Sequence, residues 1–185
     1  FEPAGRRDTA SPPESESAPK RAKGYLRDGD RWASNADTLP WRGTAAGGGL
    51  STSADLARFA AALMDGTLLS KRLFEQATMA QAPKGGYGYG FGVAGTGAMR
   101  RFGHGGGAPG MNGELMVVPA SRTIVVALAN LDPPAASRIA TGDGGKSHDH
   151  DVRGHRGGLA LVRHHPVGLE DEVGKDMGEE KCGEG

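Results

Sequence analysis

Residues 100–130 have the sequence RRFGHGGGAPGMNGELMVVPASRTIVVALAN, and three of their segments have the composition of β-strands. These segments are RRFGHGG, GELMVVP and TIVVALAN, and clusters of Gly, Pro and Ser separate them, as expected at turns. The last segment is almost wholly apolar, which is typical of a central strand that is covered on both faces. With YGYGFGV (87–93) before them, the segments predict three or four neighbouring antiparallel strands.

Two helices are predicted before these strands. Thr52 or Ser53 is a suitable N-cap, and Asp55 lies three residues after Thr52, close to a capping box. Apolar residues then recur at helical spacing up to Gly66 and predict an ordinary core stripe: Leu56, Phe59, Ala60, Leu63 and Met64. A second helix is predicted over residues 70–79. Helices followed by neighbouring antiparallel strands predict the α+β fold class.

The N-terminal part of the chain has fewer regular signals. Residues 8–22 are rich in Pro, Ser and charged side chains and predict a loop. KGYLRDGDRWA (23–33) predicts a β-hairpin with Asp28-Gly29 at its turn. Trp32 and Trp41 are both expected to pack, either in the core or at the rim of a cleft.

Composition and charge exclude several classes of protein. The chain has 185 residues and 32 glycines, with no Gly-X-Y period that would indicate collagen. Residues 1–140 carry 16 Lys and Arg against 12 Asp and Glu, whereas residues 141–185 carry 6 against 10, so the zero net charge is a cancellation. No nucleic-acid partner is expected without a basic excess. A single cysteine, Cys182, excludes an internal disulfide, and no apolar run approaches the ~18 residues of a transmembrane segment.

The change of composition near residue 140 predicts two regions. Residues 1–140 are the expected folded domain. Residues 141–185 form a tail rich in Gly, His and charge, and disorder is expected there because its one apolar cluster, Leu159–Val162, is too short to bury a face. Its histidines, among them His148 and His150, are of a type that binds metal, but the tail offers little to hold three or four ligands in fixed geometry. We therefore expect no metal site and no cofactor.

The segment Arg101–Gly110 carries the most specific chemical signal. A strand without side chains leaves its backbone N–H groups open to close approach by a ligand, and such groups can hold a developing oxyanion. His104 adds a titratable imidazole beside them. The same residues also fit a glycine-rich turn with an incidental surface histidine, and the residues alone leave both interpretations open.

Two other interpretations of these glycines fit less well. His104-Gly105-Gly106-Gly107 is similar to the oxyanion loop of lipase-type α/β-hydrolases, but that fold needs a G-x-S-x-G nucleophile elbow, which the sequence lacks. A phosphate-binding P-loop needs Gly-Lys-Ser/Thr after the glycines, where Ala108-Pro109 stand instead.

Four blocks of the sequence resemble the C-terminal half of the serine β-lactamase-related family of class C β-lactamases, DD-peptidases and esterases, which are similar to penicillin-binding proteins. The blocks are GGGLSTSADLARFAAALMDGTLLS (47–70), YGYGFGV (87–93), GHGGGAPGMNGELMVVP (103–119) and IVVALAN (124–130). The resemblance implies a sandwich in which helices flank an antiparallel sheet. It also implies a bacterial serine hydrolase, often exported or periplasmic, that forms an acyl-serine intermediate with a β-lactam, a D-Ala peptide or an ester.

One of the three motifs that line the cleft of this family maps onto the chain. His104-Gly105-Gly106 matches the Lys/His-x-Gly motif at the sheet edge. The match implies that His104 is an electrostatic or proton-transfer partner and that Gly105 and Gly106 contact substrate. The backbone N–H of Gly107 is the implied oxyanion donor.

The other two motifs have no convincing match. Tyr-x-Asn does not occur, and Ser-x-x-Lys has one formal match, Ser17-Ala18-Pro19-Lys20, in a polar segment broken by prolines. Such a segment does not predict the helix that would place serine and lysine on one face. We therefore expect a hydrolase fragment that starts after these motifs and takes a carbonyl substrate only when complete. The alternative is a non-catalytic remnant or a weak metal binder with a His-rich tail. If upstream helices normally cover one sheet face, TIVVALAN is expected to expose an apolar surface.

Overall fold

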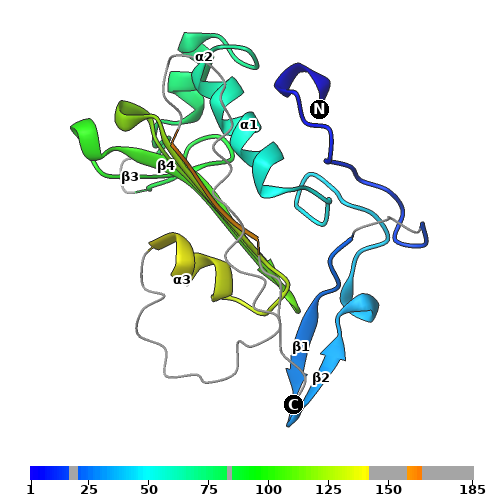
Figure 1. Ribbon diagram of the computed structural model, residues 1–185. Helices are drawn as coiled ribbons and strands as arrows, with labels where there is room; N and C mark the ends of the chain where they lie inside the picture. Colours follow the sequence, from blue (N-terminus) through cyan, green and yellow to red (C-terminus); the bar gives the residue numbers. More distant parts are fainter. Residues whose placement is uncertain (17–20, 83–84, 142–157, 164–185) are drawn as a thin grey trace, which may run out of the picture.

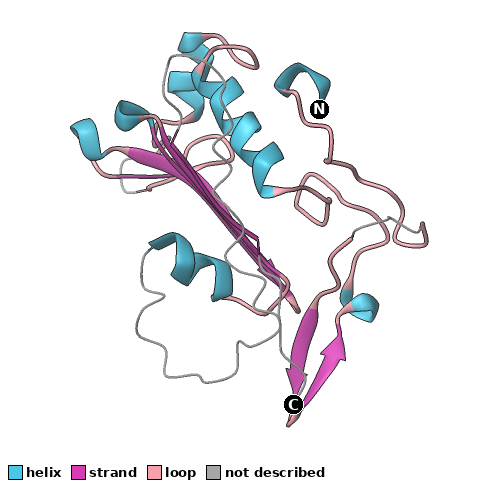
Figure 2. Cartoon of the chain, in the orientation of Figure 1, coloured by secondary structure: helices cyan, strands magenta, loops and turns pink. Residues whose placement is uncertain are grey.

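A five-stranded antiparallel sheet forms the centre of the protein, with the strand order β3-β4-β5-β6-β7. The computed structural model describes residues 1–16, 21–82, 85–141 and 158–163 (Figure 1). The strands are β3 (Gly92–Ala94), β4 (Arg101–Ala108), β5 (Met111–Val118), β6 (Thr123–Ala129) and β7 (Gly158–Arg163). Helices lie on both sides of this sheet (Figure 2), so the predicted α+β class is confirmed.

Short connections set the register of the three longest strands. Pro109-Gly110 joins β4 to β5, and Gly110 adopts a φ of 70°, a left-handed conformation that favours glycine. A 3-10 turn, Pro119–Ser121, leads from β5 into β6. Because both connections are short, β4, β5 and β6 form a continuous antiparallel meander, as the sequence predicts.

One face of the sheet packs on α1 (Ser53–Met64) and α2 (Lys71–Ala77). The side chain of Thr52 accepts a hydrogen bond from the N–H of Asp55, so Thr52 is the N-cap of α1. The buried cluster on this face combines residues of α1 with residues of three strands: Ala57, Ala60, Leu63, Phe102, Leu115, Val117, Ile124 and Val126. The two predicted helices are therefore confirmed.

The opposite face packs on α3 (Ala135–Thr141), a helix that the sequence analysis does not predict. Val125 and Ala127 of β6 form a second buried cluster together with Ala136 and Ala140 of α3. β6 is thus covered on both faces, as predicted for a central strand. The expectation of an exposed apolar surface on this strand is wrong, because α3 covers it from within the chain.

The predicted hairpin is a separate two-stranded sheet formed by β1 (Tyr25–Asp28) and β2 (Arg31–Ser34). It lies beyond one end of the central sheet (Figure 1). Gly29 in its turn adopts a φ of 59°, which explains the choice of glycine there.

Neither tryptophan packs into the domain, so that prediction is wrong. Trp32 is 42% exposed and Trp41 is 69% exposed. The guanidinium groups of Arg27 and Arg42 lie 5.0 Å and 4.9 Å from the respective ring centroids. Each indole is therefore in contact with a cation at the surface rather than with the apolar core.

The N-terminal segment is held against α1 by Asp55, whose side chain is fully buried. The carboxylate accepts hydrogen bonds from the N–H groups of Arg7 and Asp8, from the hydroxyl of Thr9 and from the guanidinium of Arg58. Burial raises the pKa of this carboxyl, but the four hydrogen bonds together outweigh burial and hold the pKa below its ordinary value. Asp55 therefore stays charged inside the protein.

Two segments differ from the sequence-based expectations. Only the end of the predicted strand 87–93 enters β3, and Tyr87 makes an isolated bridge to Gly92. β7 lies in the region 141–185, where no ordered element is expected, and its backbone pairs with β6 from Thr123↔Arg163 to Leu128↔Gly158. The open edge of an apolar strand is a ready partner for another short segment, which explains this pairing.

Candidate active site

His104 lies near the middle of β4, and its imidazole is exposed. Its Nε2 atom lies 2.8 Å from the hydroxyl oxygen of Tyr87. The two rings meet edge to face, with their centroids 6.0 Å apart and an angle of 77° between their planes. The histidine that the sequence singles out therefore has an aromatic, hydrogen-bonding partner from the segment before β3.

The shortness of β3 leaves part of β4 without a neighbouring strand on that side. β3 pairs only with residues 101–103 of β4. The N–H of Val93, the middle residue of β3, donates to the carbonyl of Gly86 and so points away from β4. Its neighbour Gly92 must then turn its backbone groups toward β4, where it faces Gly103.

This alternation determines which backbone groups of β4 reach the open edge. Since Gly103 turns its N–H and C=O toward β3, Gly105 and Gly107 turn theirs to the same side. β5 pairs with these residues from the other side, but β3 does not extend that far, and no strand of the described chain pairs with β4 at Gly105 and Gly107 on the β3 side. Both glycines are exposed. The N–H of Gly107, the predicted oxyanion donor, is therefore directed to an accessible sheet edge.

Close packing explains one of the three glycines at this edge. A Cβ atom on Gly107 would collide with the ring of Pro133, whereas one on Gly105 would meet the carboxylate end of Glu114, a flexible side chain that can move aside. A Cβ atom on Gly106 would meet nothing within 4 Å. Glycine at this last position keeps open space on the face of β4 that carries the histidine.

Asn112 of β5 connects the glycine strand to α3. Its Nδ2 donates to the carbonyl of Gly106 at 2.7 Å, and its Oδ1 accepts from the N–H of Ala136 at 2.7 Å. The side chain is buried, so these hydrogen bonds replace those with water. Asn112 thereby fixes the position of β4 relative to the start of the helix.

The turn at the end of β4 is held from two other parts of the chain. The side-chain amide of Asn35 donates to the carbonyl of Pro109 at 3.0 Å. The carboxylate of Asp132 accepts from the N–H of Gly110 at 2.8 Å. These contacts limit the movement of the hairpin that carries the predicted site.

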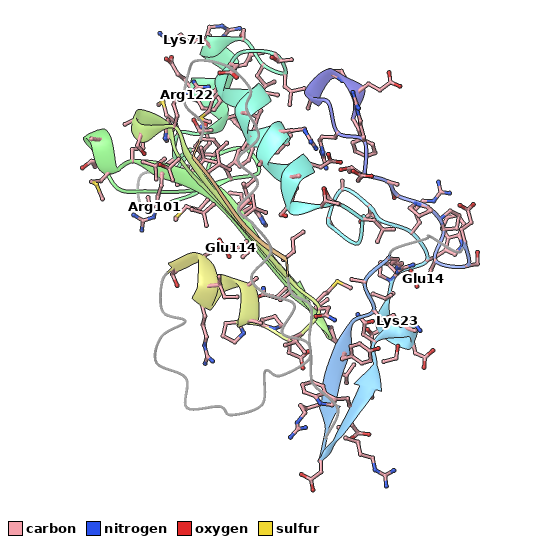
Figure 3. All side chains as sticks on the ribbon, in the orientation of Figure 1. Glu14, Lys23, Lys71, Arg101, Glu114 and Arg122 are labelled. Carbon is pink, nitrogen blue, oxygen red and sulfur yellow. The ribbon has the colours of Figure 1, made fainter. Side chains whose placement is uncertain are left out.

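A groove of about 450 Å³ runs along β3 and β4, and its lining residues include Tyr87, His104, Arg101 and Glu114. Arg101 and Glu114 project from the side of the sheet that faces α3 (Figure 3). The carboxylate of Glu114 accepts a hydrogen bond from the hydroxyl of Ser137 at 3.0 Å. The groove therefore has a cation and a carboxylate on the α3 face of the sheet and the imidazole on the opposite face of β4.

The four residues that the sequence analysis proposes for the site are consecutive in β4: His104, Gly105, Gly106 and Gly107. The formal Ser-x-x-Lys match at residues 17–20, the tail histidines and Cys182 lie outside the described residues. Within the described ranges, no group of three or more His, Cys, Asp and Glu side chains is placed to hold a metal ion.

Sequence reasoning missed three residues that shape the site: Tyr87, Asn112 and Glu114. Asn112 and Glu114 are polar residues in an otherwise apolar strand segment, MNGELMVV. Polar residues in such a segment indicate side chains that need hydrogen-bond partners within the fold. Tyr87 has no such signal, because its contact with a residue 17 positions away depends on the pairing of β3 with β4.

Comparison with known proteins agrees with this architecture. The family model described as Beta-lactamase matches residues 1–148. The chain belongs to the beta-lactamase family. A penicillin-binding protein from Bacillus halodurans superposes with a TM-score of 0.70 at 26% sequence identity, over 77% of this chain and 45% of that chain. An octameric penicillin-binding protein homologue from Pyrococcus abyssi gives a TM-score of 0.66 at 26% identity, over 77% of this chain and 34% of that chain.

This beta-lactamase-family chain spans less than half the length of either structural relative. No curated protein matches it. Among the described residues, no helix has both the length and the apolar character needed to cross a membrane. The predicted family and the predicted sandwich of helices and antiparallel sheet are both confirmed.

Proposed function

We propose that this chain supplies the oxyanion-binding edge of a serine hydrolase that acts on an amide or ester carbonyl through an acyl-serine intermediate. The observation that carries the proposal is the open edge of β4, where the backbone groups of Gly105 and Gly107 are accessible beside His104. Family membership supports the reaction class, and β-lactams, D-Ala peptides and esters are the corresponding substrate classes.

In this proposal the Gly107 N–H donates to the carbonyl oxygen of the substrate as negative charge develops on it. A donor fixed in a sheet needs little reorganisation during the reaction, which makes such groups effective. His104 lies three residues away on the same strand and acts as an electrostatic or proton-transfer partner. The nucleophile and its base belong to a Ser-x-x-Lys element and a Tyr-x-Asn element, for which the printed sequence has no convincing match.

The first test asks whether the chain acts alone. We expect no stoichiometric labelling of the purified chain by a fluorescent β-lactam or by an activated-ester probe. Labelling at Ser17, or at any other serine of the chain, would contradict the assignment of the nucleophile to another segment. Mass spectrometry of the intact and digested protein measures both outcomes.

The second test supplies the missing elements. The chain is fused to the part of the Bacillus halodurans penicillin-binding protein that lies outside the 45% of that protein matched by this chain. In a fusion that acquires labelling, Gly107→Pro and Gly107→Ala both add a Cβ atom beside the ring of Pro133, but only the proline variant loses the N–H, so their ratio isolates the donor. We expect the proline variant to react about 100-fold more slowly than the alanine variant, which is the effect of losing one oxyanion donor. Equal rates for the two variants would exclude Gly107 from this role.

A further inference from the structure

Tyr87 holds a defined position over β4 although it lies outside every helix and strand. Its carbonyl accepts from the N–H of Gln81 at 2.9 Å, and its backbone bridges to Gly92. On either side, the carbonyl of Gly86 accepts from Val93 and the N–H of Gly88 donates to Phe91. The segment is therefore tied to its surroundings by backbone hydrogen bonds before, at and after the tyrosine.

The glycines that flank Tyr87 are required by close packing. A Cβ atom on Gly86 would collide with the carbonyl of Val93, and one on Gly88 would collide with the carbonyl of Ala77 at the end of α2. The tyrosine side chain thus extends from a close-packed segment, and its ring meets the imidazole edge to face. Its hydroxyl reaches Nε2 of His104 at 2.8 Å.

We propose that Tyr87 is a positioning residue that holds the imidazole of His104 in the tautomer with hydrogen on Nδ1, by donating its hydroxyl hydrogen to Nε2. The assignment of the tautomer rests on the contact between Tyr87 and His104, whereas its consequence for catalysis rests on the proposed function. Nothing in the Lys/His-x-Gly motif specifies a tyrosine at this place.

The direction of the hydrogen bond follows from the chemistry of the two groups. A neutral imidazole has one nitrogen that donates and one that accepts. A phenol hydroxyl is a good donor, and an unprotonated imidazole nitrogen is a much stronger acceptor than a phenol oxygen. The hydrogen therefore lies on the phenol oxygen and points to Nε2, which leaves Nδ1 as the nitrogen that carries hydrogen.

This assignment restricts what His104 can do at the glycine edge. With Nε2 occupied by Tyr87, the neutral imidazole offers a substrate an N–H donor at Nδ1 and no free lone pair. A role as general base at Nε2 requires the tyrosine hydroxyl to move away first. Tyr87 thereby favours the electrostatic role of His104 over proton abstraction.

Nuclear magnetic resonance on the full chain tests the tautomer. Long-range ¹H–¹⁵N correlation of the histidine rings shows which nitrogen carries hydrogen, and the His104→Gln variant identifies the signals of His104. We expect the Nδ1-protonated pattern in the wild type at alkaline pH, where imidazoles are neutral. In Tyr87→Phe we expect a shift toward the Nε2-protonated form. Tyr89→Phe is the matched control, because it removes the same atom from an exposed tyrosine two residues away.

Acylation by diethyl pyrocarbonate supplies an independent readout, since the reagent needs a free imidazole lone pair. Trypsin releases residues 102–122 as one peptide, in which His104 is the single histidine, so its modification rate can be followed by mass spectrometry. Loss of one hydrogen bond at Nε2 should increase the rate about fivefold in Tyr87→Phe, from the net strength of such a bond. The rate in Tyr89→Phe should equal that of the wild type.

An unchanged tautomer and an unchanged acylation rate in Tyr87→Phe would overturn the proposal. Circular dichroism of each variant checks that the fold is retained, and Tyr87→Phe keeps the ring that meets the imidazole. These readouts need no catalytic activity. Failure of the tautomer proposal is therefore distinguishable from failure of the proposed function, which is measured by labelling of the fused protein.

Discussion

Asp55 is a single residue on which the attachment of the N-terminal segment depends. Its carboxylate is out of contact with water, yet it has four hydrogen-bond donors, and the segment from Arg7 to Thr9 supplies three of them. A buried charge is tolerated only with such partners, and removing either side leaves the other unsatisfied. The segment and the helix are therefore coupled through one side chain.

This coupling predicts a pH-dependent loss of stability that Asp55→Asn removes. The pKa of Asp55 in the folded state lies below the unfolded value of about 3.9. The ionised carboxylate therefore contributes its full share to the free energy of unfolding above a pH of about 3.9, and this share is lost as the pH falls through the folded-state pKa. At pH 7 the variant should lose about 3 kcal/mol in the free energy of unfolding. In acid, the free energies of unfolding of the variant and the wild type should become more similar.

Urea unfolding between pH 2 and pH 7 measures both effects. Asp30→Asn, at the exposed turn of the hairpin, is the control and should follow the wild-type curve. A pH-independent difference between Asp55→Asn and the wild type would show that the charge of the carboxylate does not matter.

The sequence indicates the residues of the candidate site only where their proposed role lies in the backbone. The run of glycines after His104 indicates an open strand edge, because glycine is the one residue that leaves the backbone bare. Its exposure and the direction of its N–H groups agree with that interpretation. The hydroxyl of Tyr87 could not be placed, since its distance from the imidazole depends on where β3 ends.

At the scale of elements, α3 shows how a short helix depends on its surroundings. Helices of this length are marginal in isolation, and packing accounts for most of their stability. The Oδ1 atom of Asn112 accepts from the N–H groups of Ala136 and Ser137, at 2.7 Å and 3.3 Å, and so satisfies donors at the helix start. A side chain of β5 thus takes the place of a local N-cap.

Asn112→Ala is predicted to loosen α3 and the strand edge together. The substitution leaves the buried N–H of Ala136 and one contact to the Gly106 carbonyl without a partner, at a cost of about 2 kcal/mol. Hydrogen exchange should accelerate at Ala136 and Ser137 more than in α1. Ser137→Ala, which removes only the hydroxyl contact to Glu114, should leave exchange at Ala136 nearly unchanged. Equal protection of α3 in both variants would contradict the role of Asn112.

The contrast between α1 and α3 explains which elements the sequence specifies. α1 has its own N-cap at Thr52, a regular apolar stripe and a glycine after its end. It begins at Ser53, directly after the predicted N-cap. α3 follows two prolines and has only seven residues, so local signals do not reveal it. β7 is likewise a short apolar segment whose partner, β6, lies far away in sequence. Long-range pairing of this kind is not encoded in local periodicity.

At the scale of the whole molecule, the two edges of the sheet differ. On one side, β4 extends past β3 and presents bare backbone at the proposed site. On the other side, β7 pairs with β6 along its whole length, which satisfies the backbone of the most apolar strand. An uncovered apolar edge promotes association between chains. The sheet therefore presents a bare glycine backbone at one edge, whereas at the other edge β7 keeps the most apolar strand, β6, from being the outermost strand.

Truncation after residue 141 is therefore predicted to cause self-association, because it removes β7 and opens the edge of β6. A chain that ends at residue 163 keeps β7 and serves as the matched control. We expect the shorter chain to form concentration-dependent oligomers and to melt several degrees lower, whereas the control should behave as the full chain does. Size-exclusion chromatography with light scattering measures the association, and circular dichroism measures the melting. Identical behaviour of the two truncated chains would mean that β7 does not protect the edge of the sheet.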